Sequence, residues 1–285
     1  MELLQKRGFS AFFSDTFRFI KENAAHFFTN YFIINGIFLL LSLVKNYFDG
    51  AGDSFPVIIE LLFGLVSIAF AIINWTFVTI YMILYNEKKT DFDYQDIMNA
   101  YKEKIGKILI FMLASILVAI PVIIVFYIVM LLLAITIVGF VLIPLLYASL
   151  VLLFALALFE YLNTDRNIFD CYTYAFKLFS KKFWATTGST ALLYLMIFVI
   201  YGFALGATGM VASFMELNTS DPEDMMVSIQ TILASPSVLI TLTLLSILMV
   251  VVQISQGIIY FSQKELLENI SVKSTIDDIG RNDDE

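Results

Sequence analysis

Hydrophobic residues along this chain gather in long runs that short polar segments separate. The runs extend over residues 30–44, 55–85, 107–162, 187–214 and 235–261. A helix that crosses a membrane needs roughly 20 predominantly apolar residues, and most of these runs reach that length. The pattern predicts an all-α fold of the polytopic membrane helix-bundle class.

The run at residues 107–162 is too long for a single span. As one helix, its 56 residues would extend for about 84 Å, whereas the hydrocarbon core of a bilayer is about 30 Å thick. A turn is predicted at Thr136–Gly139, where β-branched residues lead into a glycine that tolerates a tight turn. Three spans would leave almost no residues for two turns, so two spans are predicted here and six in all.

Basic residues lie almost entirely on one side of this six-span arrangement. Sixteen of the 17 Lys and Arg residues fall on that side, and only Lys45 falls on the other. Because Lys and Arg accumulate in cytoplasmic loops, both termini are predicted to be cytoplasmic. A seventh span would move Arg166 and Lys177–Lys182 outside, so the charges also favour six spans.

Amphipathic segments of helical period precede the first, third and fifth spans. Their apolar stripes are formed by Phe9, Phe12, Phe13, Phe17, Ile20, Ala24 and Phe27, by Tyr94, Ile97, Met98, Tyr101, Ile105 and Ile108, and by Ile168, Phe169, Tyr172, Phe176, Phe179 and Phe183. Charged residues occupy the opposite faces. We expect three helices that lie in the cytoplasmic membrane interface.

The same segments predict how the chain is organised. Residues 1–270 form a single membrane domain of three repeated units, at about residues 8–86, 92–163 and 167–268, and each unit is an interfacial helix followed by a helical hairpin. Residues 271–285 are rich in acids and form a flexible tail. The interfacial helices either rest on headgroups and neighbouring spans, or dock a cytoplasmic partner through Lys177, Lys181 and Lys182.

Composition narrows the classes of function. Hydrophobic residues make up 60% of the chain and charged residues 15%, against about a quarter charged in soluble domains. The net charge of −8 argues against nucleic-acid binding, which needs clustered Lys and Arg. A single cysteine, Cys171, and a single histidine, His26, argue against a disulfide framework and a metal site. No cofactor is predicted, and the first residues do not resemble a signal peptide.

Four amides lie inside the predicted spans. Asn74 and Gln253 lie about 16 and about 14 Å from the inner ends of their spans, while Asn35 and Gln256 are shallower, at about 9 Å. Interhelical hydrogen bonds are the expected role of these side chains, and a path for a polar substrate is the alternative. The only carboxylates within apolar runs, Glu60 and Glu160, fall near the ends of their runs, where we expect them to reach water.

Two further features concern helix packing. Gly202 and Gly206 form a GxxxG pattern, which lets two helix backbones approach closely within one chain or between chains. Pro121 and Pro144 interrupt the third and fourth spans, where kinks that serve packing are expected. Broken helices that line a transport site are the alternative.

One stretch resembles a known family. The sequence FALALFEYLNTDRNIFDCYTYAFKLFSKKFWATTGSTALL places an acid, Glu160, before a short polar link, an amphipathic helix and Lys-Lys-Phe-Trp. It resembles polytopic bacterial membrane proteins grouped with the membrane domain of glycerophosphodiester phosphodiesterase. The layout agrees over the whole chain, and residues 139–192 agree in detail. The resemblance implies a bacterial inner-membrane location and lends no catalytic residue, because the phosphodiesterase carries its chemistry in a separate soluble domain.

No catalytic constellation is visible in the sequence. Gly50-Ala51-Gly52-Asp53 matches the GxGD string of intramembrane proteases, but it lies in a polar loop, and no second aspartate falls within a span. We therefore expect a non-catalytic membrane protein that is a subunit or accessory factor of a larger complex. Its expected partners are membrane lipids and other membrane subunits or further copies of itself. A small-molecule or lipid transporter is the alternative.

Overall fold

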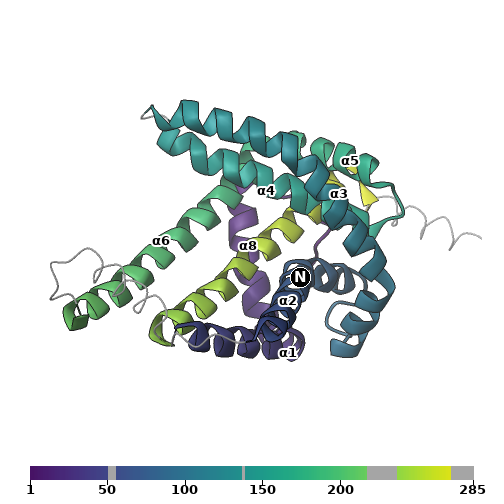
Figure 1. The fold of residues 1–285 in the computed structure, drawn as a ribbon. Coiled ribbons are helices and arrows are strands. Elements are labelled where there is room, and N and C mark those ends of the chain that lie inside the picture. Colours follow the sequence, from purple (N-terminus) through teal and green to yellow (C-terminus); the bar gives the residue numbers. More distant parts are fainter. Residues whose placement is uncertain (51–55, 137–138, 217–235, 271–285) are drawn as a thin grey trace, which may run out of the picture. The chain divides into compact units, whose positions relative to one another are not determined.

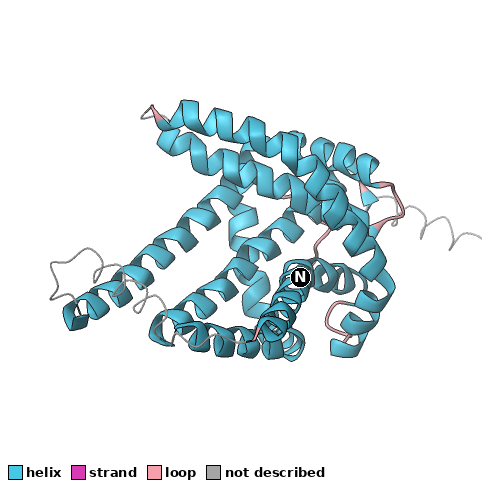
Figure 2. Cartoon of the chain, in the orientation of Figure 1, coloured by secondary structure: helices cyan, strands magenta, loops and turns pink. Residues whose placement is uncertain are grey.

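All regular structure in the described part of the chain is helical. The computed structural model describes residues 1–50, 56–136, 139–216 and 236–270, and its seven helices are shown in Figures 1 and 2. They are α1 (Phe9–Gly50), α2 (Val57–Lys88), α3 (Tyr94–Ala134), α4 (Gly139–Asn163), α5 (Ile168–Lys181), α6 (Phe183–Glu216) and α8 (Pro236–Glu268). The prediction of an all-α protein is confirmed.

Five of these helices are long and apolar enough to cross a membrane. The qualifying segments are Phe9–Leu41, Val57–Lys88, Tyr94–Ala134, Leu142–Asn163 and Phe183–Ala207. The predicted sixth span corresponds to α8, a helix of 33 residues whose side chains are described only from Ile247 onward. Residues 217–235 and the predicted acidic tail at residues 271–285 lie outside the described residues.

The predicted turn in the long apolar run is present. Helix α3 ends at Ala134 and α4 begins at Gly139, and the two helices pack along one another (Figure 1). The backbone N–H of Gly139 donates to the Thr136 hydroxyl over 3.0 Å. A Cβ atom on Gly139 would lie 1.8 Å from the carbonyl oxygen of Leu133, so the turn needs glycine for close backbone approach.

The two prolines at which kinks are predicted lie inside helices that continue past them. Pro121 is within α3 and Pro144 is within α4. The surrounding helices run on for more than one turn on the C-terminal side of each proline. Each proline therefore removes one backbone donor without ending its helix.

The amphipathic segments differ from the predicted layout. The first two continue without a break into the following spans, as α1 of 42 residues and α3 of 41 residues. Only the third is a separate helix, α5. It ends at Lys181. The C-cap residue, Lys182, has φ −135° and ψ 50°, and its ammonium donates to the carbonyl oxygen of Arg7 over 2.9 Å.

The chain divides into two compact units that are discontinuous in sequence. Unit 1 contains residues Met1–His26, Val78–Leu195 and Val251–Glu285, and unit 2 contains Phe27–Phe77 and Met196–Val250. Every basic residue except Lys45 belongs to unit 1. The charge separation that predicted one side of the membrane thus coincides with the division into units.

In unit 2, α1 and α2 pair as an antiparallel hairpin. Along the pair, the ring of Phe27 meets that of Phe77 with centroids 5.5 Å apart, and Phe38 stacks on Phe70 at 5.8 Å. At the far end Lys45 Nζ lies 3.4 Å from a carboxylate oxygen of Glu60. Glu60 keeps 41% of its side chain exposed.

In unit 1, the C-terminal part of α8 is closely packed at Gly257. A Cβ atom there would lie 2.9 Å from the methyl carbon of Met82 on α2 and 2.9 Å from the ring of Phe159 on α4. The Phe159 ring also stacks on Tyr260 with centroids 5.2 Å apart. Glycine therefore allows α8 to approach both helices and to bring its next turns into contact with α4.

Candidate functional site: a buried carboxylate network

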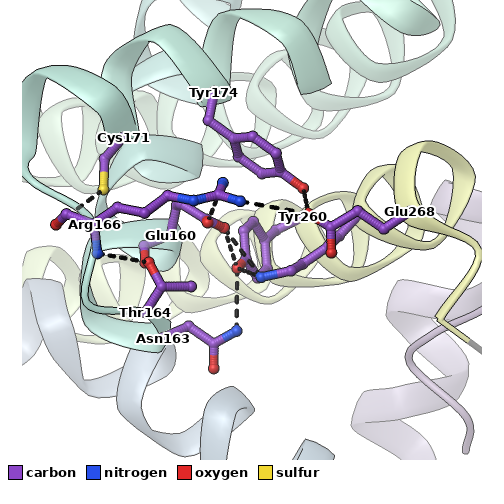
Figure 3. A network of polar contacts seen from close by, with 9 residues as sticks. Glu160, Asn163, Thr164, Arg166, Cys171, Tyr174, Tyr260 and Glu268 are labelled. Carbon is purple, nitrogen blue, oxygen red and sulfur yellow. Dashed lines mark hydrogen bonds and ion pairs between the residues drawn. The ribbon is translucent and has the colours of Figure 1, made fainter. Parts of the chain in front are cut away.

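The most concentrated set of polar contacts in unit 1 surrounds Glu160 (Figure 3). Its side chains come from the last turn of α4, the loop that follows, α5, and the last turns of α8. We call this set the Glu160 network, and its members are Glu160, Asn163, Arg166, Tyr174, Tyr260, Lys264 and Glu268.

Glu160 is completely buried, with 0% exposure. Its Oε1 atom accepts from Arg166 Nη1 over 2.7 Å, and its Oε2 atom accepts from the Tyr260 hydroxyl over 2.7 Å and from Lys264 Nζ over 3.2 Å. The expectation that Glu160 reaches water is therefore wrong. Packing of α8 against α4 seals the carboxylate, and two cations compensate its charge.

Tyr260 connects the carboxylate to two further groups. Its hydroxyl accepts from Asn163 Nδ2 over 3.1 Å and from Lys264 Nζ over 3.0 Å. Tyr260 and Lys264 are one helical turn apart on α8, and therefore both face α4. The helix places a neutral donor and a cation on the same carboxylate oxygen.

Glu268 and Tyr174 form the outer part of the network. The Tyr174 hydroxyl donates to Glu268, and Arg166 Nη2 lies 3.8 Å from the same carboxylate oxygen. The guanidinium carbon of Arg166 also lies 4.1 Å from the centre of the Tyr174 ring, a favourable cation–π distance. Burial, followed by the bond to Glu268, raises the pKa of Tyr174 well above its ordinary value.

The loop between α4 and α5 holds Arg166 in place. The Thr164 hydroxyl donates to the carbonyl oxygen of Glu160 over 2.8 Å, which closes the end of α4. Asn167 caps α5, because its side-chain oxygen accepts the backbone N–H of Asp170 over 2.9 Å. Arg166 lies between Thr164 and Asn167 in the sequence, so a local hydrogen bond fixes the loop on each side of it.

This arrangement binds helices together and leaves little capacity for chemistry. Both Glu160 oxygens are occupied, and two carboxylates balance two cations. Cys171, on the adjacent face of α5, is buried, and burial is the main cause that raises the pKa of its thiol to about 11. A thiol with so high a pKa is a poor nucleophile at neutral pH. In the described part of the chain, no group of three His, Cys, Asp or Glu residues is placed to hold a metal ion.

Two cavities adjoin the network. One of about 510 Å³ is lined by Arg166, Asp170, Thr173, Tyr174, Lys177, Leu267 and Glu268. The second, of about 610 Å³, is lined by Lys107, Tyr161, Asp165, Arg166, Asn167, Ile168, Phe169 and Asp170. Both have Arg166 and Asp170 in their walls, so unit 1 has room for a ligand beside the α4–α5 loop.

A second buried cation, Arg7, holds the N-terminal segment to unit 1. Its Nε lies 2.8 Å from an Asp15 oxygen, and its other nitrogens donate to the carbonyl oxygens of Glu2, Leu3 and Gln5. The Arg7 backbone N–H donates to the Ser262 hydroxyl over 3.0 Å. Residues from α1, α8 and the end of α5 therefore meet at this arginine.

The predicted interhelical amides have different surroundings. Asn74 accepts a hydrogen bond of 2.8 Å from the Tyr31 hydroxyl on α1, as expected for an interhelical contact. Asn35 is buried and donates to the carbonyl oxygen of Tyr31 on its own helix over 3.2 Å. On α8, Gln256 contacts the Tyr194 hydroxyl. Gln253 Oε1 has no hydrogen-bond partner among the described residues.

The other predicted site residues are not members of the network. No described atom lies within 4 Å of a Cβ atom built on Gly202 or Gly206, so this GxxxG pattern makes no close contact within the described chain. Lys177 and Lys181 are exposed on α5, and Lys177 lines one of the two cavities. Lys182 instead uses its ammonium for the bond to Arg7.

Sequence reasoning did not predict the network, although it carries two local signals. Glu160 is an acid within an apolar run, and Tyr260 and Lys264 have the four-residue spacing of one helix face. Nothing local connects them, because Glu160 and Tyr260 are 100 residues apart.

Comparison of the chain with protein-family models, with curated protein sequences and with solved structures found no match. The resemblance to the phosphodiesterase membrane domain therefore stays a prediction from the sequence. The function has to be argued from the described residues themselves.

Proposed function

We propose that this protein is a non-catalytic component of a larger membrane assembly in a bacterial inner membrane, with both termini in the cytoplasm. The observation that carries the proposal is the surface of α3 beyond Ser115. From Ile116 to Ala134 no residue of α3 is buried. This part of α3 is called the α3 arm below.

The α3 arm contacts the neighbouring helix, α4, through a narrow stripe of residues only. Its half-buried residues recur about once per turn and include Val118, Val122, Phe126, Val129 and Leu133, as expected for one face of a helix. Ala119 and Met130 are half-buried as well, and the remaining positions are exposed and almost all apolar. Leu117 is 72% exposed and Leu131 is 68% exposed. An apolar surface that extends around most of a helix offers room for helices of another subunit.

The Glu160 network supports the same proposal. Its charges are compensated inside unit 1, and its hydrogen bonds and ion pairs link α4, α5 and α8 to one another. We expect these bonds to hold the three helices in a fixed arrangement. A fixed base allows the α3–α4 hairpin to present one constant surface. Rigid elements position a binding surface more accurately than loops do.

Site-specific photo-crosslinking tests the proposal. A photoreactive amino acid at Leu117, Ile124 or Leu131 lies on one exposed face of the arm, and we expect each to give an adduct with the same membrane protein. The matched control is Phe111, which is fully buried on the same helix and should crosslink only within the chain. Adducts with lipid alone at all three exposed positions, together with a monomer in mild detergent, would contradict an assembly role.

Transport of a small molecule or lipid is the second candidate, favoured by a row of polar groups on α8. Ser255 Oγ, Gln256 Nε2 and both amide atoms of Gln263 are buried without hydrogen-bond partners among the described residues. Buried polar groups without partners are costly, and a bound water or substrate would satisfy them. With Cys171 replaced by serine, a cysteine at Gln256 or Gln263 should react with water-soluble thiol reagents if a polar path exists. An unreactive cysteine at both positions argues against transport.

A further inference from the structure

Helix α5 exposes aromatic and basic side chains on neighbouring edges. Phe169 is 74% exposed and Phe176 is 58% exposed, and at 100° per residue they lie within about 20° of each other on the helix. Lys177 and Lys181 lie about 80–120° from Phe169 by the same geometry. Between the two edges are the exposed hydroxyl residues Thr173 and Ser180.

The contacts of α5 show which way each edge faces within unit 1. Next to the aromatic edge, the Tyr172 hydroxyl is 2.7 Å from that of Ser115 on α3, where the apolar arm begins. Next to the basic edge, Tyr174 bonds to Glu268 at the end of α8. The aromatic edge therefore adjoins the apolar hairpin, and the basic edge adjoins the polar end of α8.

The two lysines have no anionic partner within the described chain. Neither Lys177 Nζ nor Lys181 Nζ makes an ion pair there. An acid on the same face of α5, Asp170, accepts a hydrogen bond from Asn167. Lys177 also lines the cavity of about 510 Å³, within the size range of ligand sites. The two acids that line this cavity, Asp170 and Glu268, both accept hydrogen bonds from neighbouring side chains. Lys177 is therefore the lining cation that is available to bind an anion.

Trp184 extends the aromatic edge into the start of α6. It is 71% exposed and its ring lies against that of Phe183 with centroids 5.1 Å apart. Tryptophan is enriched where membrane spans cross the headgroup level. An exposed tryptophan three residues after Lys181 thus places aromatic surface and positive charge together at the beginning of a span.

From these observations we infer that α5 binds an anionic phospholipid of the adjacent leaflet. The phosphate pairs with Lys177 at the cavity beside the Glu160 network and with Lys181 one helical turn further along α5, and the acyl chains lie against Phe169, Phe176 and Trp184. An interfacial helix with a basic edge and an aromatic edge binds in this manner, through apolar burial and attraction to anionic lipid. This lipid site is independent of any protein that the α3 arm binds.

Tryptophan quenching by brominated lipids tests the site. The chain has two tryptophans, so Trp75→Phe leaves Trp184 as the only fluorophore. The protein is placed in phosphatidylcholine vesicles that contain a minor fraction of either brominated phosphatidylglycerol or brominated phosphatidylcholine. We expect stronger quenching by the anionic lipid, and weaker preference as salt rises.

Substitution of the lysines gives the decisive comparison. Lys177→Gln with Lys181→Gln is expected to reduce the preference for the anionic lipid about fivefold for each lysine, the usual effect of one basic residue near an anionic surface. Lys89→Gln is the matched control, because it removes an exposed lysine whose ammonium already pairs with Glu2 at 3.2 Å, and it should leave the preference unchanged. Slow alkylation of the buried Cys171 confirms that α5 stays in place in each variant.

Three results would overturn the inference. Equal quenching by both lipids, unchanged in the double lysine variant, excludes a site for an anionic lipid. No quenching by either lipid means that protein or water covers this face. Loss of the preference on addition of inorganic phosphate at constant ionic strength means that the lysines take a soluble anion.

Discussion

Replacement of Glu160 by alanine is expected to lower the free energy of unfolding by about 3 to 5 kcal/mol. The carboxylate is fully buried, and its removal leaves Lys264, with 11% of its side chain exposed, without its nearest counter-charge. Arg166 loses its bond of 2.7 Å at the same time. A buried cation without a partner is among the most costly defects that a single substitution creates.

Unfolding of the purified protein in detergent measures this loss, and Cys171 supplies a local readout. The thiol is buried on α5, so its rate of alkylation reports how often α5 leaves the Glu160 network. We expect faster alkylation in Glu160→Ala. Asp165→Asn is the matched control, because Asp165 pairs with Lys107 at 2.8 Å but is fully exposed, and water screens an exposed pair so that it contributes little to stability.

A double substitution separates the ion pair from simple loss of packing. Lys264→Met in the Glu160→Ala background removes the unpaired cation, and we expect part of the lost stability to return. If Glu160→Ala alone changed stability no more than Asp165→Asn does, the carboxylate would not be the buried, charge-compensated group described above.

Substitution of Arg7 by alanine is the second large effect that we expect, with a loss of about 3 kcal/mol. The arginine is 3% exposed, and its guanidinium bonds to the Asp15 carboxylate and to three backbone carbonyl oxygens. Without it, Asp15 loses its closest partner, and residues 2–6 lose the bonds that fold them against unit 1. Amide hydrogen exchange over the N-terminal segment should rise together with the loss of stability.

Arg18 offers a control that shares the same carboxylate. It lies 3.1 Å from the other Asp15 oxygen, but 51% of its side chain is exposed, so Arg18→Ala should cost no more than about 1 kcal/mol. Equal losses for the two variants would mean that burial does not distinguish the two arginines. A large loss for Arg7→Ala with unchanged exchange at residues 2–6 would show that the segment is held by other contacts.

Local features of the sequence predicted most of the helices. The five apolar runs correspond to α1, α2, the α3–α4 pair, α6 and α8, because the length and apolar character of a run depend only on neighbouring residues. The turn before Gly139 was predictable for the same reason. The breaks that we expected between amphipathic segments and spans could not be predicted from local sequence. Only the third break exists, at Lys182, and it is held by a bond to Arg7, 175 residues away.

The first amphipathic stripe shows that helical periodicity predicts the burial of side chains only in part. Of the first stripe, Phe12 and Phe27 are buried, whereas Phe9 is 45% exposed and Phe17 is 41% exposed. The buried face of α1 also includes the polar Thr16. A stripe predicts that one side of a helix avoids water, but in a membrane protein both lipid and neighbouring helices satisfy that requirement.

By itself, the sequence determined the helical class, the long apolar segments, the turn at Gly139 and the separation of basic residues from Lys45, because each depends on composition or on neighbours along the chain. Only the tertiary structure decided that Glu160 is buried and paired with Tyr260 and Lys264, that Arg7 is enclosed, and that Lys177 and Lys181 stay exposed. Those outcomes depend on contacts between residues up to about 255 positions apart, and no local pattern encodes which helix faces meet.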